Sequence, residues 1–304
     1  MMFKRAMQLP FAWIFASIIG AFILFLSIYI GVKLINTGGV QADYEIAEKI
    51  GILLGPLETG FQSSQKNDME IPVSIRIYSE CDESGNFGEQ KIKVSQFLLK
   101  KWTDSNAIVS FQNRYIFSGD YSEGKKFFIF TKQFEMPFKV ADLVYLSSSE
   151  ENYCFMNAPK NVENELKTLG QENIATSDCP DNSINICFSH GSSCDIEVEY
   201  SQKVVIKGSD RMYFEGDALM YAAIFSEKGI YECQVKRLMK RLGELSLLYR
   251  DKATLISNKC PSNLNLELLS VAAGNIQDSK SLSVVGKIAE DINKNNEIAY
   301  CKIW

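Results

Sequence analysis

The chain has 304 residues, of which 46% are apolar, and this content is ample for a hydrophobic core and excludes disorder throughout. Its net charge of −5 is unevenly distributed, because no Asp or Glu occurs before Asp43, and residues 43–304 carry all 37 acids against 29 bases (the 32 of the chain minus Lys4, Arg5 and Lys33). This acidic surplus argues against a nucleic-acid-binding surface, and we expect no nucleic-acid partner.

The first predicted element is a transmembrane helix over residues 9–35. From Leu9 to Val32 no residue is charged. A helix of that length runs about 36 Å, which spans a hydrocarbon core of about 30 Å. The tail over residues 1–8 carries Lys4 and Arg5, and this positive charge places the N-terminus in the cytoplasm. We therefore expect a single-pass protein of the cell membrane with an extracytoplasmic C-terminal domain.

A cleaved signal peptide is the alternative interpretation of this segment. Val40-Gln41-Ala42, just before Asp43, satisfies the small-residue rule for a cleavage site. The apolar region is, however, about twice as long as that of a usual signal peptide and ends several residues too early. The anchor is favoured, and the sequence leaves cleavage open.

Small residues recur at four-residue intervals on one face of the predicted anchor, at Ala12, Ala16 and Gly20. Such spacing lets two helix backbones approach closely in lipid. This face is therefore a candidate for helix–helix packing with a protein partner, although small residues are common in membrane helices.

Residues 43–62 predict an amphipathic helix, or stalk, that leads away from the membrane. Its apolar residues repeat at helical spacing: Ile46, Ile50, Leu53, Leu54, Leu57 and Phe61. Gly55-Pro56 predicts a kink within it. Packing on the protein's own domain is the favoured use of the apolar face, and a position on lipid headgroups is the alternative.

Residues 70–215 predict a mainly antiparallel sheet. Short apolar runs, such as those around Ile75 and Phe128, are separated by Gly, Asn, Asp and Ser. Tyr115–Phe130, with glycines near its middle, predicts a hairpin. Lys160–Leu169 predicts a helix that interrupts the sheet.

Residues 216–304 predict a helical region that packs on the sheet. Tyr231–Lys252 places its apolar residues on one face of a long helix. Helices over Leu264–Ala273 and Ser281–Asn293 follow, and then a short strand near Tyr300. Strands first and helices later predict an α+β fold, in which a transmembrane helix precedes a sheet domain with a C-terminal helical layer. The sequence does not decide between one domain and two.

All eight cysteines follow the apolar segment: Cys81, Cys154, Cys179, Cys187, Cys194, Cys233, Cys260 and Cys301. An even number confined to the exported part predicts disulfides formed in an oxidising compartment. Eight cysteines allow 105 pairings, among which the sequence cannot choose. Buried free thiols in a reduced protein are the alternative.

Four neighbouring residues, Cys179, Cys187, His190 and Cys194, are also candidate ligands for a tetrahedral zinc ion. Structural zinc sites usually use ligand pairs two to four residues apart, and Cys179 stands too far from the others. Disulfides explain these residues better, and we expect no cofactor. His190 is the only histidine, so a Ser–His or Cys–His catalytic site would have to use it. Its Ser-His-Gly-Ser-Ser segment predicts a surface turn instead.

Three other motifs resemble binding or catalytic sequences but are better explained as structural features. Gly119–Lys126 approaches a phosphate-binding loop, but a hairpin offers no helix N-terminus for phosphates. Cys81–Gly88 is acidic and turn-forming, lacks the alternating oxygens of a calcium loop, and predicts a hairpin turn. Ser63 and Lys66 have only the spacing of a Ser–Lys hydrolase.

Four basic residues of the long predicted helix lie on its polar side: Lys236, Arg237, Lys240 and Arg241. We expect them on a solvated face opposite the apolar stripe. An anionic lipid or partner is the alternative contact for this group.

These features favour a structural or interaction protein, a subunit or accessory of a cell-surface assembly with partners at the anchor and the outer domain. No N-glycosylation sequon occurs in the chain, so a prokaryotic surface is favoured over a glycosylated eukaryotic ectodomain. The alternatives are a membrane-tethered ligand-binding sensor domain and, less favoured, an exported hydrolase that uses carboxylates or serine without histidine.

The first 60 residues resemble a pilin or pilin-like subunit in layout, with a short basic tail, a long apolar helix and an amphipathic continuation. Precursors of that kind are cut after a small residue just ahead of the apolar helix, a position that Ala6 before Met7 matches. The acidic residue usual early in the helix is absent here. The resemblance implies a pilin-like subunit, which is a further alternative for the function.

Overall fold

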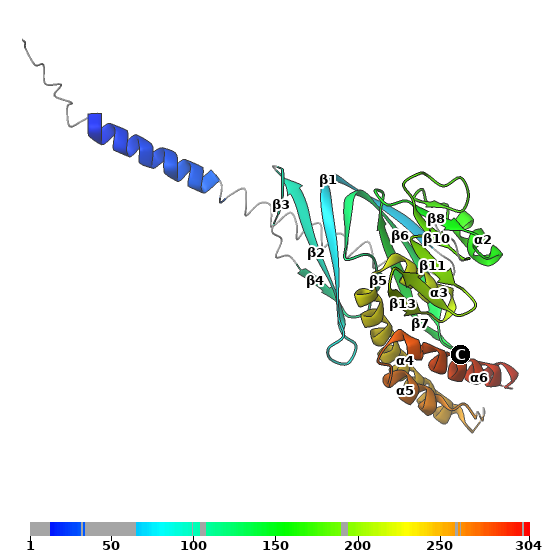
Figure 1. Cartoon of the computed structure of the whole chain (residues 1–304). Coiled ribbons are helices and arrows are strands. Elements are labelled where there is room, and N and C mark those ends of the chain that lie inside the picture. Colours follow the sequence, from blue (N-terminus) through cyan, green and yellow to red (C-terminus); the bar gives the residue numbers. More distant parts are fainter. Residues whose placement is uncertain are drawn as a thin grey trace, which may run out of the picture.

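The computed structural model describes residues 13–31, 33, 65–98, 100–103, 108–189, 194–258, 261, 263–299 and 301–304. The predicted tail, the stalk over residues 43–62 and Tyr300 lie outside the described residues. An apolar N-terminal helix, two mixed sheets and a set of C-terminal helices follow one another along the chain (Figure 1). The predicted α+β class is therefore confirmed.

The N-terminal helix, Trp13–Gly31, has 19 residues, a mean hydropathy of 2.4, and no part buried against the rest of the protein. Its two serine hydroxyls donate to backbone carbonyls one turn earlier, Ser17 to Ile14 at 2.9 Å and Ser27 to Ile23 at 2.8 Å. Its surface is thus apolar all round, as a helix in lipid requires. Its length and composition suit a membrane span, and a signal sequence would meet the same criteria.

The first sheet is curled, and its two edges lie near each other. Its pairing order is β3 (Lys101–Trp102), β2 (Glu89–Leu98), β1 (Gln65–Asp82), β6 (Tyr121–Glu135), β7 (Lys139–Ser148) and β5 (Tyr115–Phe117). β4 (Ile108–Phe111) pairs with β2 near one end, and β5, which follows β4 after only residues 112–114, pairs with β7 at the other. The short connection between β4 and β5 therefore holds the two edges of the sheet near each other, although no strand pair joins them, and we call this curled sheet the barrel.

The barrel interior is an apolar core to which each long strand contributes. Its fully buried members come from five strands: Ile75, Ile77, Ile92, Val94, Ile116, Phe127, Ile129, Val144 and Leu146. Because side chains alternate along a strand, the intervening residues Arg76 and Tyr78 of β1 face outward. Burial of each large aliphatic side chain favours folding by about 1.5–3 kcal/mol.

The hairpin predicted over Tyr115–Phe130 is wrong. β5 pairs with β7 in parallel, whereas β6 lies between β1 and β7. The Gly119-Asp120 turn therefore joins two strands that are separated by β7. Turn residues mark where the chain changes direction, and they do not determine which strands then pair.

The second sheet has the order β13 (Asp210–Tyr213), β12 (Val204–Lys207), β11 (Ile196–Glu199), β10 (Ile184–Cys187), β8 (Tyr153–Met156) and β9 (Ile174–Ala175). The sequence predicted one mainly antiparallel sheet, and the second sheet differs from that prediction. In it β8 pairs in parallel with β9 and β10, and β10 pairs in parallel with β11. The predicted helix α2 (Lys160–Leu169) is confirmed and connects β8 to β9, as a parallel pair requires.

Four further helices complete the chain: α3 (Gly216–Phe225), α4 (Lys228–Ile256), α5 (Leu266–Gly274) and α6 (Leu282–Ile298), the last preceded by the short 3-10 helix η1 (Ser279–Ser281). The three predicted helices of this region correspond to α4, α5 and α6. α3 was not predicted from the sequence. It is buried on nearly all sides, so its apolar and polar residues do not alternate with the helical period. The described residues after Tyr300 form no strand.

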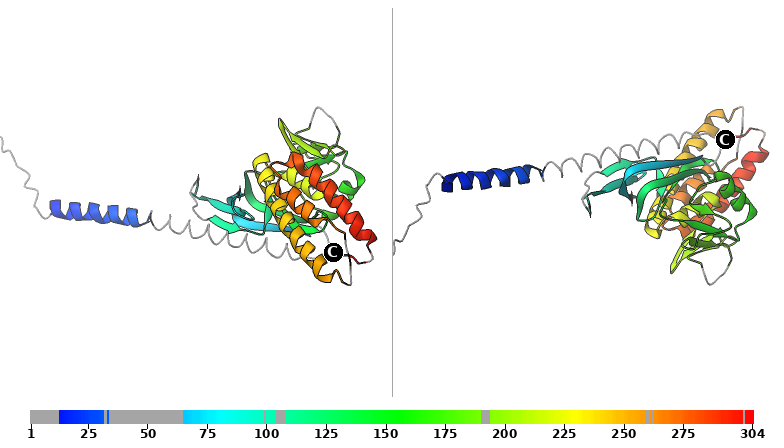
Figure 2. Two further views of the ribbon diagram at one scale, coloured as in Figure 1. Left: turned by 90° about the horizontal axis from the view of Figure 1, so that it is seen from below. Right: turned by 90° about the horizontal axis from the view of Figure 1, so that it is seen from above.

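One large apolar core joins both sheets to the helices. It includes Tyr145 of the barrel's outer wall, Phe155 of the second sheet, Tyr221 of α3, and Leu238 of α4. Tyr145 donates a hydrogen bond from its hydroxyl to the carbonyl of Ala218 at 2.7 Å, which satisfies a buried polar group. α5 contacts both α4 and α6, and the three helices form a layer on this core (Figure 2).

Candidate functional site

The N-terminal half of α4 closes one end of the barrel. Residues 112–114 join β4 to β5 and belong to neither strand. Arg237 of α4 donates hydrogen bonds to this segment and to the β1–β2 turn: Nη2 to Gln112 O at 2.7 Å, Nη1 to Arg114 O at 2.9 Å and Nε to Phe87 O at 3.0 Å. One side chain thereby ties the β1–β2 turn to the β4–β5 junction.

Gln234, one turn earlier on α4, extends this closure. Its Oε1 accepts a hydrogen bond from Arg237 Nη1 at 2.7 Å, and its Nε2 donates to Ile116 O at 3.2 Å and to the side chain of Gln90. Gln90 belongs to β2 and Ile116 to β5, so Gln234 bridges the two ends of the curled sheet. Gln234 and Arg237 are both fully buried.

The expectation that Arg237 lies on a solvated face is wrong. Both sides of this part of α4 are covered, one by the large apolar core and the other by the barrel end. Burial lowers the pKa of Arg237 from its usual value, and the nearby ring of Tyr115, 4.9 Å from the guanidinium, opposes that shift. An arginine remains charged in such an environment, so its four hydrogen bonds are charge-assisted.

The other three basic residues of the group also contact the barrel. Lys236 forms an ion pair with Glu83 at 3.0 Å. Lys240 donates to Glu83 O at 2.6 Å and Gly85 O at 3.1 Å. Arg241 donates to Val140 O at 2.8 Å. The group is therefore a set of structural contacts to loops and strand ends.

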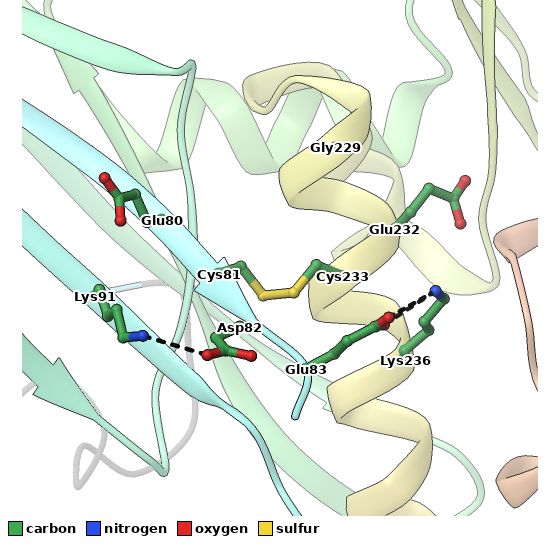
Figure 3. A pocket seen from close by; sticks show the side chains of 9 residues that line it. All are labelled: Glu80, Cys81, Asp82, Glu83, Lys91, Gly229, Glu232, Cys233 and Lys236. Carbon is green, nitrogen blue, oxygen red and sulfur yellow. Dashed lines mark hydrogen bonds and ion pairs between the residues drawn. A yellow bond between two sulfur atoms is a disulfide. The ribbon is translucent and has the colours of Figure 1, made fainter. Parts of the chain in front are cut away.

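A polar pocket of about 490 Å³ lies where α4 meets the β1–β2 hairpin (Figure 3). It is lined by Glu80, Cys81, Asp82, Glu83, Lys91, Gly229, Glu232, Cys233 and Lys236. The disulfide between Cys81 and Cys233 crosses it, and the Lys91–Asp82 and Lys236–Glu83 pairs lie on the same side of that disulfide (Figure 3). These residues are the main candidate site in the described part of the chain.

Most charges in this pocket are neutralised by neighbours. Hydrogen bonds from Ser84, and then from Lys91, lower the pKa of Asp82 to about 2. Glu232 accepts from the backbone nitrogen and the hydroxyl of Ser279, at 2.7 and 2.6 Å. Asp82 is thus ionised at neutral pH and cannot serve there as a general acid. The arrangement braces the hairpin against α4.

The cysteines form disulfides, as the sequence predicts. Cys81 pairs with Cys233 across 152 residues, Cys154 with Cys179 across 25, and Cys187 with Cys194 across 7. Cys301 is also disulfide-bonded. The first of these bonds links the barrel covalently to α4.

Three of the four candidate zinc ligands are used in these disulfides. Cys179, Cys187 and Cys194 each belong to a disulfide and have no thiolate to offer a metal. His190 and Cys260 lie outside the described residues. Within the described ranges, His, Cys, Asp and Glu form no group of three suited to a metal ion.

The remaining sequence motifs have structural positions. Cys81–Gly88 forms the predicted turn of the β1–β2 hairpin, in which Asp82 pairs with Glu89. Gly119–Lys126 leads into β6 and contains no helix N-terminus. Ser63 lies outside the described residues.

The small-residue face of the N-terminal helix is described only in part. Ala16 and Gly20 are exposed, and no atom outside the helix lies within 4 Å of the position that a Cβ on Gly20 would occupy. Ala12 lies outside the described residues.

A second polar cluster, which was not predicted from the sequence, lies on the outward side of β1, β3 and β6. The guanidinium of Arg76 lies 4.0 Å from the ring centre of Trp102 and 5.1 Å from that of Tyr121. Its Nε contacts Glu123 at 2.6 Å. The signal for this face was the alternation of Arg76 and Tyr78 with buried isoleucines in β1.

No protein-family model, no curated protein and no solved structure matches this chain in comparisons with known proteins.

Proposed function

We propose that this chain is a single-pass membrane-anchored extracytoplasmic protein with a structural or interaction role, a subunit or accessory of a prokaryotic cell-surface assembly. The observation that carries the proposal is the apolar helix Trp13–Gly31, no part of which is buried, whereas the residues that follow form apolar cores without it. An exposed surface of that size and composition requires lipid or another apolar partner.

The disulfides support the extracytoplasmic location. Disulfides persist in oxidising compartments and are rare in the cytosol. The apolar helix and the disulfides together point to a secreted or membrane-anchored extracytoplasmic protein. Lys4 and Arg5 ahead of the helix favour an N-terminus that is retained in the cytoplasm.

The chemistry of the polar pocket supports a role other than catalysis. Asp82, Glu83, Lys91 and Lys236 pair with one another, and the pKa of Asp82 is lowered, whereas a general acid at neutral pH needs a raised value. Arg237 holds backbone carbonyls of the barrel. These groups maintain a rigid domain that can present its surface to partners.

The experiment is membrane fractionation followed by N-terminal analysis of the mature protein. We expect the full chain in the membrane fraction that resists carbonate extraction. Protease added to intact cells whose surface it can reach should degrade the outer domain. A mature chain that is water-soluble and starts at Asp43 contradicts the anchor. A membrane-bound chain that starts at Met7 supports the pilin-like alternative.

A further inference from the structure

We propose that the Cys81–Cys233 disulfide is a thiol–disulfide exchange site, at which a neutral or cationic dithiol reversibly releases α4 from the β1–β2 hairpin. The bond joins the end of β1 to the second turn of α4 and crosses the polar pocket between them (Figure 3). This inference goes beyond the proposed function, because the reaction takes place within the outer domain and does not require the anchor.

Both cysteines of this bond can be reached from solvent. Cys81 and Cys233 are each only partly buried, and both line the pocket. In each of the other two disulfides whose cysteines are both described, one cysteine is buried. The exposed fraction is 0% for Cys154 and 4% for Cys187. Access therefore distinguishes the Cys81–Cys233 bond from the other two.

Burial of one cysteine hinders exchange in those two bonds. A thiol can attack only the sulfur that it reaches, and it then expels the other sulfur as a thiolate. For the other two bonds the expelled thiolate would be that of Cys154 or Cys187, which water does not reach, and a buried anion is unfavourable. At the Cys81–Cys233 bond either thiolate would form in a pocket open to water. The fold thus favours exchange at this bond.

The reaction exchanges one disulfide for another. A thiolate of the dithiol attacks one sulfur of the Cys81–Cys233 bond, forms a mixed disulfide and expels the second cysteine as a thiolate. The other thiol of the partner then loses its proton and attacks the mixed disulfide, which expels the first cysteine. The two expelled thiolates take up the two protons that the partner lost. The chain gains two thiols, and the partner, which supplies both electrons, becomes a disulfide.

The charges of the pocket select the kind of thiol. Lys91 and Lys236 each pair with a carboxylate, that of Asp82 and that of Glu83. The carboxylates of Glu80 and Glu232 remain beyond these two pairs. The pocket therefore carries an excess of negative charge, which repels an anionic reductant and favours a thiolate borne by a neutral or cationic molecule.

Reduction should loosen the hairpin without unfolding the domain, because other contacts join the hairpin to α4. Lys236 pairs with Glu83 at 3.0 Å, and Lys240 donates to Glu83 O at 2.6 Å. Arg237 donates to Phe87 O at 3.0 Å. These contacts keep the two cysteines, whose Cα atoms are 6.1 Å apart, close enough for the bond to form again.

The first test reduces the folded full chain in detergent with dithiothreitol, a neutral dithiol. Samples taken over time are alkylated, and the new thiols are located by peptide mass spectrometry. We expect thiols at Cys81 and Cys233 to form at least roughly tenfold faster than those of the other two bonds. In the chain unfolded by urea, which is the control, the three bonds should react at similar rates. Similar rates in the folded chain, or earlier reduction of either other bond, would overturn the proposal.

Filling the pocket tests the route of access. Gly229 of α4 lines the pocket, and no atom lies within 4 Å of the position that its Cβ would occupy. Gly229→Phe should therefore be accommodated and should slow reduction of the Cys81–Cys233 bond by roughly tenfold. The matched control is Lys228→Phe, at an exposed neighbour that does not line the pocket. Equal rates for the two variants would contradict access through the pocket.

Thiols of opposite charge test the choice of partner. Cysteamine is cationic and mercaptoacetate is anionic, and each rate is divided by that of the same reagent on the unfolded chain, so that intrinsic reactivity cancels. We expect the quotient for cysteamine to be several-fold higher at low salt, and the difference to vanish at about 1 M salt, where charges are screened. Equal or reversed quotients at low salt would contradict the assigned charge of the partner.

Hydrogen exchange tests the release of the hairpin. The chain is reduced only at Cys81 and Cys233 and alkylated, and its exchange is compared with that of the oxidised chain. We expect faster exchange in residues 80–90 and 228–236 and no change in the second sheet. Faster exchange throughout the domain, or no change in the hairpin, would overturn the proposed release.

Discussion

The guanidinium of Arg237 donates a hydrogen bond to the backbone carbonyl of Gln112 at 2.7 Å, across 125 residues of sequence. This bond is made where β4 passes into β5. The same side chain donates to Phe87 O in the β1–β2 turn. Two loops of the first sheet are therefore held together by a residue of a helix that follows both sheets in the chain.

Replacing Arg237 with Met should destabilise the domain by at least about 3 kcal/mol, because buried acceptors lose their charged donor. The free energy of unfolding is measured by urea titration in detergent. Lys236→Met is the matched control, since it removes a neighbouring, partly exposed ion pair and should cost less than about 1 kcal/mol. Equal losses for the two variants would show that the barrel closes without Arg237.

Removing the Cys81–Cys233 disulfide should cost more than removing Cys187–Cys194. The first closes a loop across 152 residues and the second across 7. Loop-closure entropy predicts a difference of about 3 kcal/mol. Double alanine variants are compared by denaturant unfolding without reductant. If removal of Cys187–Cys194 lowers the free energy of unfolding by the same amount, loop-closure entropy is not the main source of the stability that the disulfides provide.

The stability of the domain should rise with pH between about 8 and 9, below the range in which tyrosines of the unfolded chain lose protons that the buried Tyr145, Tyr153, Tyr221 and Tyr231, whose pKa values are raised by burial, retain. Burial lowers the pKa of Lys207 from 10.5 to about 8, with Glu227 and Glu151 opposing the shift, and the ammonium donates to Ser226 O at 2.8 Å. In this range the unfolded chain binds more protons than the folded one, so the free energy of unfolding increases as pH rises. Below pH 8 both states are protonated and this dependence disappears.

Lys207→Met should abolish that pH dependence. The exposed Lys280 provides the matched control, and Lys280→Met should leave the dependence unchanged. Urea titrations of the three proteins at several pH values give the slopes. Equal slopes in all of them would assign the effect to other groups.

Gly88→Ala should destabilise the β1–β2 turn more than Gly85→Ala. Both glycines have positive φ, +60° and +75°, so each substitution carries the left-handed penalty of about 1–2 kcal/mol. A Cβ on Gly88 would also lie 2.3 Å from Asp82 O, whereas nothing lies within 4 Å at Gly85. We expect an additional cost of about 1–3 kcal/mol for Gly88→Ala. Thermal unfolding of the two variants measures it, and equal shifts would contradict the close contact.

The elements that have a local signal could be predicted from the amino-acid sequence. The uncharged run gave the apolar helix, period-3.6 patterns gave α2, α4, α5 and α6, and the acidic turn at Cys81–Gly88 gave the β1–β2 hairpin. Each of these depends on residues within a few turns of one another. The restriction of all cysteines to one side of the apolar segment indicated disulfides, without their pairing.

The strand pairing, the disulfide pairing and the direction of the Arg237 side chain depend on tertiary contacts and could not be predicted from local patterns. Periodicity reports that one face of a segment is buried and carries no information on what buries it. Arg237 lies on the polar side of an amphipathic helix, as solvated arginines do, and became buried because the barrel end lies against that side. Tyr115–Phe117 pairs with β7 because residues 112–114 carry the chain across the gap between the two ends of the sheet.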